Sequence, residues 1–96
     1  MITKRERVLV NNRTGHKYSG AQFLDFWEKE TDSVAIECAR IGCDNIPTNG
    51  GHVYKVGSGP HPHWYIVPLC DSCNQKFFPK GYFVFSDDMV DALYQD

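Results

Sequence analysis

Two closely spaced pairs of cysteines constrain this chain more than any other feature of its sequence. Four residues separate Cys38 from Cys43, two separate Cys70 from Cys73, and 26 lie between the pairs. With 96 residues, the chain is near the size at which a metal ion or a disulfide supplements a small hydrophobic core. The cysteine pairs can supply either kind of support, and the redox compartment decides between them.

The N-terminal part of the sequence indicates the compartment. Residues 1–17 contain no apolar stretch of the kind that a secretory signal requires. No run of about 18 apolar residues, which a membrane span needs, occurs in the chain. We therefore expect a cytoplasmic protein without a membrane contact. In a reducing cytosol, paired cysteines stay as thiols and bind metal ions in preference to each other.

Zinc is the metal that this cysteine pattern favours. Zn2+ binds four soft or borderline donors in a tetrahedron, and two short turns can each present two sulfur atoms to one ion. Gly42 directly precedes the second thiol of the first turn, as is typical of such turns. A shell of four thiolates leaves no position for water or substrate, so the predicted ion is structural rather than catalytic. The alternative, cysteines buried as small apolar side chains, does not account for the spacing of both pairs.

The charged residues are unevenly distributed along the chain. The formal net charge is -2, and a zinc ion on four thiolates would take it to about -4. General attraction to nucleic acid is therefore weak, and any phosphate contact would be local. Residues 86–96 carry four aspartates and no base, whereas residues 1–17 form a basic arm. This arm either contacts phosphate or is an ordinary solvated terminus; its basic residues are Lys4, Arg5, Arg7, Arg13 and Lys17.

The residues before the first cysteine predict a strand and a helix. Residues 7–10 are β-prone, and the turn-forming residues 11–15 end that strand. Ser19, with a glutamine three residues later, is typical of a helix N-cap. An apolar stripe on this helix is assigned to the core. The stripe consists of Phe23, Leu24, Phe26 and Trp27.

The segment that contains the cysteines predicts a hairpin between two metal-binding turns. Residues 33–38 lead into the first turn as a short strand. Residues 51–56 and 63–67 are extended and flank a loop rich in glycine and proline. Pro68 ends the second strand of this hairpin, because proline lacks the N–H that a strand ladder uses.

The last part of the chain predicts a short helix, a strand and a second helix. The second cysteine pair begins the short helix, with Asp71 or Ser72 as its cap, and residues 79–81 break it. Residues 82–85 form a strand, and Ser86 caps the final helix. The apolar face of that helix consists of Met89, Val90, Leu93 and Tyr94.

The order of these motifs resembles a known family. Three motifs follow one another: Cys38-x4-Cys43, Gly51-His52-Val53 and Tyr65-Ile66-Val67-Pro68-Leu69-Cys70-x2-Cys73-Asn74. This order resembles the zinc-containing HNH, or ββα-metal, nucleases, including the phage junction-resolving endonucleases, over somewhat under half of the chain. The resemblance implies an α+β fold with a treble-clef-like ββα core in residues 33–80. Residues 1–32 would add an N-terminal helix and residues 81–96 a C-terminal strand and helix, within one domain spanning residues 1–96.

The resemblance also implies catalytic roles for two residues. His52 corresponds to the general base that activates water, and Asn74 corresponds to a ligand of a second cation, Mg2+ or Mn2+. Neutral imidazole accepts a proton near pH 7, and an amide oxygen is an adequate ligand for magnesium. Each residue also has a structural interpretation. His52 can bond a backbone carbonyl, and Asn74 can bond backbone near the start of a helix.

One position departs from the family pattern. The family usually has an aspartate directly before the histidine as the main charged ligand of the catalytic cation, and this chain has Gly51. An amide alone binds magnesium poorly, so either the catalytic ion is lost or another side chain replaces the aspartate. The candidates for replacement are Asp44, Asp71, His61 and His63.

Two functions therefore remain open. The negative net charge and the glycine at position 51 favour a catalytically degenerate binding module that contacts nucleic acid or a protein partner. Its aromatic surface would draw on Tyr54, Trp64, Tyr65 and Phe78. The alternative is a metal-dependent HNH endonuclease that hydrolyses DNA phosphodiesters with His52 as general base. In that enzyme Lys76, Lys80 or the basic arm would contact phosphate.

Overall fold

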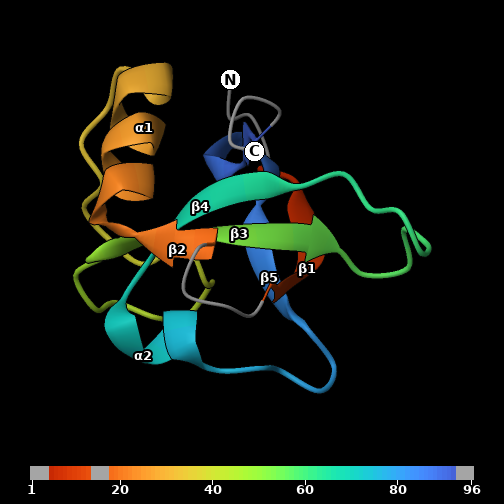
Figure 1. Cartoon of the computed structure of the whole chain (residues 1–96). Coiled ribbons are helices and arrows are strands. Elements are labelled where there is room, and N and C mark those ends of the chain that lie inside the picture. The colour runs from red at the N-terminus through yellow and green to blue at the C-terminus, as the bar shows by residue number, and fades with distance from the viewer. Residues whose placement is uncertain (1–4, 14–17, 93–96) are drawn as a thin grey trace.

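Six strands in the described part of the chain form one antiparallel sheet, which curls around the interior of the molecule (Figure 1). The computed structural model describes residues 5–13 and 18–92. The order of strands across the sheet is β5-β1-β3-β4-β6, and β2 pairs with β3 beside this path. Their bounds are β1 (Arg7–Asn12), β2 (Ser19–Gly20), β3 (Asn49–Lys55), β4 (Tyr65–Leu69), β5 (Tyr82–Phe85) and β6 (Val90–Asp91).

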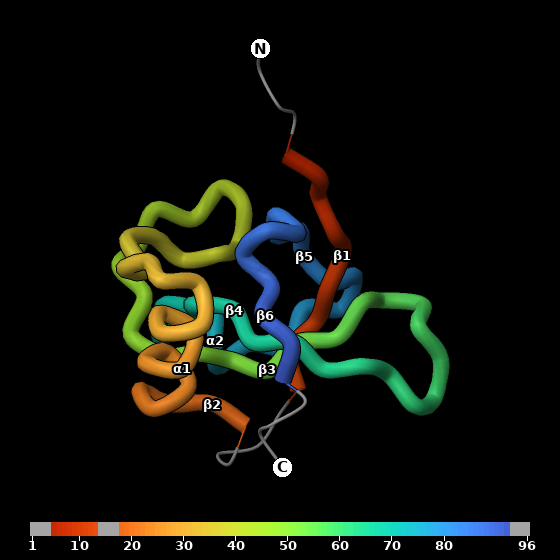
Figure 2. Tube along the Cα trace, turned by 90° about the horizontal axis from the view of Figure 1, so that it is seen from above, coloured from red at the N-terminus to blue at the C-terminus, as the bar shows by residue number. Residues whose placement is uncertain are grey.

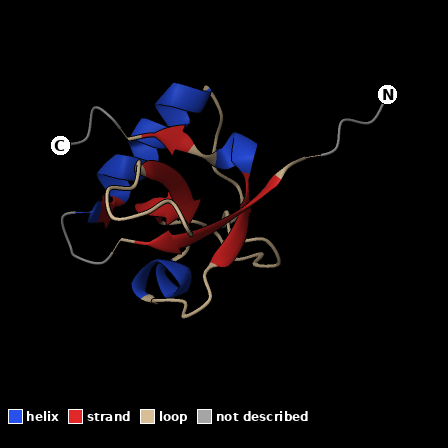
Figure 3. Ribbon diagram, turned by 90° about the vertical axis from the view of Figure 1, so that its right-hand side faces the viewer, coloured by secondary structure: helices blue, strands red, loops and turns tan. Residues whose placement is uncertain are grey.

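Few helical segments accompany the sheet, and they lie at its periphery (Figure 3). They are α1 (Ala21–Thr31), α2 (Asp71–Gln75) and a 3-10 turn, η2 (Ser86–Asp88). The prediction of a small α+β fold is confirmed. None of the helices within the described residues has the length and apolar character that crossing a membrane requires.

The β3–β4 hairpin forms the centre of the sheet. Its register pairs Asn49 with Leu69 at one end and Val53 with Tyr65 at the other. The loop that joins the two strands projects from the body of the molecule on the side away from α1 (Figures 1 and 2). The predicted extended segments at 51–56 and 63–67 thus match this hairpin closely, although β4 continues through Pro68. The carbonyl of Pro68 accepts a hydrogen bond from Ala39 N–H.

Two groups of buried side chains occupy the interior. The smaller group packs α1 against the hairpin and consists of Phe23, Trp27, Ile66 and Ala92, with Phe26 partly buried against it. The larger group includes three of the four cysteines and consists of Val10, Cys38, Ala39, Val53, Val67, Leu69, Cys70, Cys73, Tyr82 and Val84. The predicted core stripe of α1 is therefore confirmed at Phe23 and Trp27. The cysteines belong to the core rather than to the surface.

The backbone of α1 lies directly against β3 at Gly50. A Cβ atom added to Gly50 would lie 2.5 Å from Leu24 N and 2.6 Å from Phe23 O. Real Cβ atoms do not approach backbone so closely, so only glycine permits this contact. Gly50 thereby fixes how near the helix lies to the hairpin.

The predicted cap of α1 is wrong. Its N-cap is Gly20, and no side chain caps the helix. Ser19 instead lies in β2, where it pairs with Gly51, and its hydroxyl oxygen accepts a hydrogen bond from Asn74 Nδ2. The serine is unable to cap the helix because sheet pairing and this distant amide already engage it.

The predicted strand at 33–38 is also wrong. The segment has no regular structure, and Val34 and Ile36 are largely exposed. Ala35 N–H donates to the Glu28 carboxylate of α1, and Cys38 N–H donates to Asn45 O within the cysteine turn. The alternating apolar residues thus find no neighbouring strand, which is what a β-prone sequence needs to become one.

The predicted final helix is replaced by the turn η2 and the strand β6. β6 pairs with β4, so Val90 lies opposite Ile66 and Asp91 lies opposite Tyr65. The free edge of β4 thus engages a segment whose apolar spacing favours a helix. Leu93 and Tyr94, which were assigned to the same helix, lie outside the described residues.

Candidate metal centre

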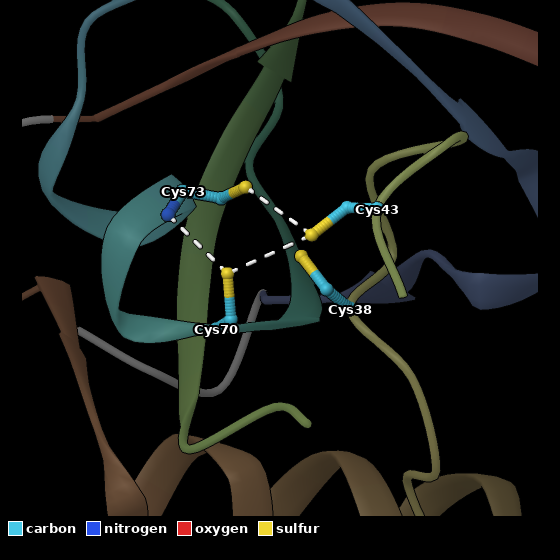
Figure 4. A group of neighbouring side chains, drawn as sticks. All are labelled: Cys38, Cys43, Cys70 and Cys73. Carbon is cyan, nitrogen blue, oxygen red and sulfur yellow. Dashed lines mark hydrogen bonds between the residues drawn. The ribbon is translucent and has the colours of Figure 1, made fainter. Parts of the chain in front are cut away.

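The four cysteines converge from one irregular segment and one helix start, at the same end of the hairpin. Cys38 and Cys43 lie in the irregular segment between α1 and β3, whereas Cys70 and Cys73 lie at the start of α2. Figure 4 shows their sulfur atoms turned toward one another. The first turn is closed by a hydrogen bond from Cys43 N–H to Arg40 O and is joined to β4 by the bond from Ala39 N–H to Pro68 O. The sheet therefore holds both turns in place.

The spacing of the sulfur atoms matches a tetrahedral metal shell. Metal–sulfur bonds of about 2.3 Å give sulfur–sulfur edges of about 3.8 Å. Cys43 Sγ lies 3.8 Å from Cys70 Sγ and 3.8 Å from Cys73 Sγ. All four Sγ atoms lie within 4.8 Å of one another. A disulfide needs about 2.05 Å between sulfur atoms, so the cysteines are free thiols. The four sulfur atoms therefore fit a structural metal site.

The surroundings act differently on the individual thiols. Burial raises the pKa of Cys38 well above its ordinary value, and burial also raises the pKa of Cys73. Burial opposes ionisation of Cys70 as well, but hydrogen bonds from Cys73 N–H and the Asn45 amide lower the pKa of Cys70 to about 7. A metal ion binds the deprotonated sulfur, so metal affinity at this site increases with pH.

Two polar side chains that the sequence analysis did not identify point at the sulfur atoms. Arg40 Nη1 lies 4.0 Å from Cys73 Sγ, and Asn45 Nδ2 lies 3.6 Å from Cys70 Sγ. A divalent ion on four thiolates carries a net charge of -2, and such donors orient the sulfur ligands and offset that charge. The position of both residues in or beside the first cysteine turn was the available signal.

Cys70 also has a structural role at the start of α2. It is the N-cap of this helix, and its sulfur accepts a hydrogen bond from Cys73 N–H at 3.4 Å. The prediction of Asp71 or Ser72 as the cap is therefore wrong. The metal-binding turn and the helix N-terminus are one unit, since the same sulfur atom serves both.

His52 is buried beside α1. The residue is 3% exposed, and the centroid of its ring lies 4.8 Å from that of the Phe23 ring and 5.8 Å from that of the Tyr18 ring, edge-on to both. Nδ1 lies 2.9 Å from the carbonyl oxygen of Tyr18. Burial lowers the pKa of His52, although the Tyr18 carbonyl opposes this shift, and the nearby positive charge of Arg13 lowers it further. The imidazole is therefore neutral at pH 7 and bonded to backbone.

Asn74 lies next to Gly51, and its amide is engaged by β2. Asn74 Nδ2 donates to Ser19 Oγ at 3.2 Å. A Cβ atom added to Gly51 would lie 3.0 Å from Asn74 Oδ1 and 2.7 Å from Leu69 Cδ1. Position 51 thus faces Asn74, and a side chain there would require the Leu69 and Asn74 side chains to shift.

The side chains proposed to replace the missing aspartate do not gather into a second site. Within residues 5–13 and 18–92, the four cysteines are the only group of three or more Cys, His, Asp or Glu side chains close enough to hold an ion. His63 Nε2 pairs with Asp91 Oδ1 at 2.9 Å. Asp71 accepts a hydrogen bond from Gln75, and Asp44 and His61 are exposed.

The residues predicted to contact phosphate or to form an aromatic surface differ in how exposed they are. Lys76 and Lys80 are exposed, while Arg5 pairs with Asp87 at 3.1 Å. Phe78 packs against the larger core and contacts the Tyr82 ring at 4.7 Å. The other three aromatic residues of the hairpin, Tyr54, Trp64 and Tyr65, are each half-buried. Lys4 and Lys17 of the basic arm lie outside the described residues.

No protein-family model, no curated protein and no solved structure matches this chain. The site is therefore interpreted from its own residues.

Proposed function

We propose that this chain is a zinc-stabilised, HNH-like binding module that does not hydrolyse its partner. The observation that carries the proposal is the pair of 3.8 Å distances from Cys43 Sγ to the sulfur atoms of Cys70 and Cys73. These distances equal the edges of a tetrahedral zinc–thiolate shell to within about 0.1 Å. Zinc suits the site because four thiolates from two short turns are the donor set of closed structural zinc sites.

The arrangement supports a scaffold rather than a reaction centre at this ion. Four sulfur donors complete its coordination, so neither water nor a phosphate oxygen has a position on the metal. The hairpin β3–β4 and the helix α2 then follow one another around the ion, in the order that the HNH resemblance implies. The ion would hold the base of the hairpin and leave its far end to contact a partner.

The surroundings of Gly51 support the absence of hydrolysis. A second cation would need a charged oxygen ligand beside Asn74, because an amide alone binds magnesium poorly. A side chain added at Gly51 would touch Leu69 and Asn74 at once. The Asn74 amide is already hydrogen-bonded to Ser19, and the His52 ring to Tyr18 O. The two residues that would carry catalysis are thus used to hold residues 18–19: His52 bonds Tyr18 from β3, and Asn74 bonds Ser19 from α2.

The HNH endonuclease is the alternative, and one observation favours it. If Nδ1 of His52 donates to the Tyr18 carbonyl, the other ring nitrogen keeps its lone pair and can accept a proton. A base held in this way needs only a cation ligand and access to substrate. The burial of His52, at 3% exposure, argues against that access.

One experiment separates the two functions. Purified protein is tested for zinc by elemental analysis and then incubated with plasmid and single-stranded DNA in Mg2+ and in Mn2+. The module predicts one zinc per chain and no cleavage with either cation. Cleavage that His52→Ala abolishes, while zinc content stays at one per chain, would replace the module by the endonuclease. Absence of stoichiometric zinc would reject both.

A further inference from the structure

The guanidinium of Arg13 lies over two aromatic rings toward the loop end of the hairpin. Its Cζ atom is 3.5 Å from the centroid of the Tyr18 ring and 4.4 Å from that of Trp64. Nη2 of Arg13 donates to the Tyr18 hydroxyl at 2.7 Å, and Arg13 N–H donates to His52 O at 2.9 Å. Both the backbone and the side chain of this arginine are therefore fixed relative to β3.

A fourth side chain extends this row. The Tyr54 ring meets the Trp64 ring edge-on, with 5.4 Å between the centroids. We call Arg13, Tyr18, Tyr54 and Trp64 the stacking surface. Each of the four residues is half-buried, so none is fully enclosed by the fold. The surface is pre-ordered, because its members hold one another before any partner arrives.

The hairpin that carries this surface is free of carboxylates. Residues 45–70 contain no aspartate or glutamate, although the chain has twelve such residues. Among the described residues, no carboxylate pairs with Arg13 or Lys55. Arg5 differs, because its guanidinium pairs with both Asp87 and Asp88. The positive charge of Arg13 is thus available to an anion, although the chain as a whole is acidic.

We infer that the stacking surface binds single-stranded nucleic acid, with an unpaired base stacked on Trp64 or Tyr54 and a neighbouring phosphate bound by Arg13. Aromatic faces accept any unpaired base, and an arginine that stacks on a ring can still direct its N–H groups at phosphate. A base pair within a duplex does not offer its face. The inference rests on the proposed function in one respect, namely that the module binds without hydrolysis.

A protein partner fits this surface less well. Of the six exposed large apolar side chains, Val56 is the only one in the hairpin and it is the least exposed of them, at 44%; the others are Val34, Ile36, Ile46, Phe77 and Phe83. Protein interfaces bury aliphatic and aromatic side chains in a continuous core. The stacking surface instead combines planar rings with a cation that pairs with no carboxylate in residues 5–13 and 18–92, which is the combination that single-stranded nucleic acid requires.

The test is a fluorescence-anisotropy titration of the zinc-loaded protein with labelled oligonucleotides of about 12 residues. Oligodeoxythymidylate, oligouridylate and a DNA duplex of matched length are compared. Arg13→Gln removes the stacked cation, Arg13→Lys keeps the charge but loses the planar group, and Tyr54→Ala removes one ring. Arg5→Gln and Phe77→Ala are the matched controls, since these residues lie outside the stacking surface. Zinc content and circular dichroism are measured for every variant.

We expect both single strands to bind more tightly than the duplex. Arg13→Gln and Tyr54→Ala should weaken single-strand binding by about 5-fold or more, and Arg13→Lys should weaken it less than Arg13→Gln. The slope of log K against log salt should fall by about one in Arg13→Gln. Stronger binding to oligouridylate than to oligodeoxythymidylate would identify RNA as the partner, and the reverse order would identify DNA.

Results of two kinds would overturn the inference, one from the oligonucleotides and one from the variants. One is that folded, zinc-loaded protein binds no oligonucleotide more tightly than the duplex. The other is that Arg13→Gln binds as the wild type does, or that Arg5→Gln weakens binding equally. In either case the proposed function stands if zinc is stoichiometric and DNA stays intact. Cleavage of the DNA, by contrast, would reject the proposed function without affecting the comparison between Arg13 and Arg5.

Discussion

The metal centre and the surroundings of Gly51 lie along the same hairpin. They differ in whether their potential metal ligands already have hydrogen-bond partners within the fold. At the metal centre, four sulfur atoms face one another, and the contacts that they make to N–H groups, from 3.4 to 4.0 Å, leave the centre between them open. Beside β2, the imidazole of His52 and the amide of Asn74 have hydrogen-bond partners at 2.9 and 3.2 Å. Converging donors without strong partners indicate a ligand site, whereas donors satisfied within the fold indicate a structural role.

The two regions also differ in how tightly the chain surrounds them. The thiols come from an irregular segment and from the start of α2, and their sulfur atoms, which lie within 4.8 Å of one another, leave a centre of the size of one metal ion. Gly51 instead has Leu69 and Asn74 so close that a single added carbon would displace them. This difference teaches that donor atoms form a candidate ligand site only where the fold leaves space between them. Four changes test it.

The largest effect is expected from loss of a thiol. Structural zinc contributes about 10–16 kcal/mol in small zinc-binding peptides, whereas small domains have a total stability of about 5–15 kcal/mol. We therefore expect Cys73→Ser to abolish stoichiometric zinc binding and to unfold the domain, as measured by elemental analysis and circular dichroism. Ser72→Ala, at the exposed neighbouring position, is the control and should leave both unchanged. A folded Cys73→Ser variant without zinc would show that the metal centre does not support the fold.

The next effect should come from adding one carbon at the second region. Gly51→Ala places a Cβ against Leu69 and Asn74, and overpacking of this kind costs about 1–3 kcal/mol. Denaturant unfolding should therefore give a lower midpoint, while zinc content stays at one per chain. Leu69→Val shortens the crowded side chain, so the double variant should be less destabilised than the sum of the single ones. Equal stability of Gly51→Ala and wild type would mean that the position can accept a ligand side chain.

A smaller, pH-dependent effect should come from His52. Because burial lowers its pKa in the folded state, the unfolded chain binds the proton first as the pH falls below about 6.5. The free energy of unfolding should therefore fall between pH 7 and pH 5, by no more than about 1.4 kcal/mol per pH unit. His52→Asn retains a donor for Tyr18 O but does not titrate. With zinc in excess, the free energy of unfolding of His52→Asn should fall less than that of the wild type between pH 7 and pH 5. Equal falls in the two proteins would contradict the burial of a neutral imidazole.

The smallest effect is expected at the contact between Asn74 and Ser19. A hydrogen bond of this kind contributes about 0.5–1.5 kcal/mol. Asn74→Ala and Ser19→Ala should each lower stability by about that amount, and the double variant should lose little more than either one. Zinc content should not change. Strictly additive losses, or a Mg2+-dependent stabilisation that Asn74→Ala removes, would point to a cation at Asn74 instead.

Local spacing alone was enough to predict several parts of this protein. The two cysteine turns, the hairpin strands, the core residues Phe23 and Trp27 and the strand at 82–85 all follow from patterns within a few residues. The convergence of the thiols followed as well, because Zn2+ accepts few other donor sets and the spacing of both pairs fits its geometry.

The tertiary structure decided everything that depends on a distant partner. Residues 33–38 have the composition of a strand but no neighbour to pair with, and residues 90–91 form a strand because the edge of β4 lies beside them. His52 bonds Tyr18, and Arg13 stacks on Trp64, across intervals that no local pattern relates. Sequence periodicity reports which face of an element is apolar, whereas a hydrogen bond or a stacked ring depends on which surfaces the fold brings together.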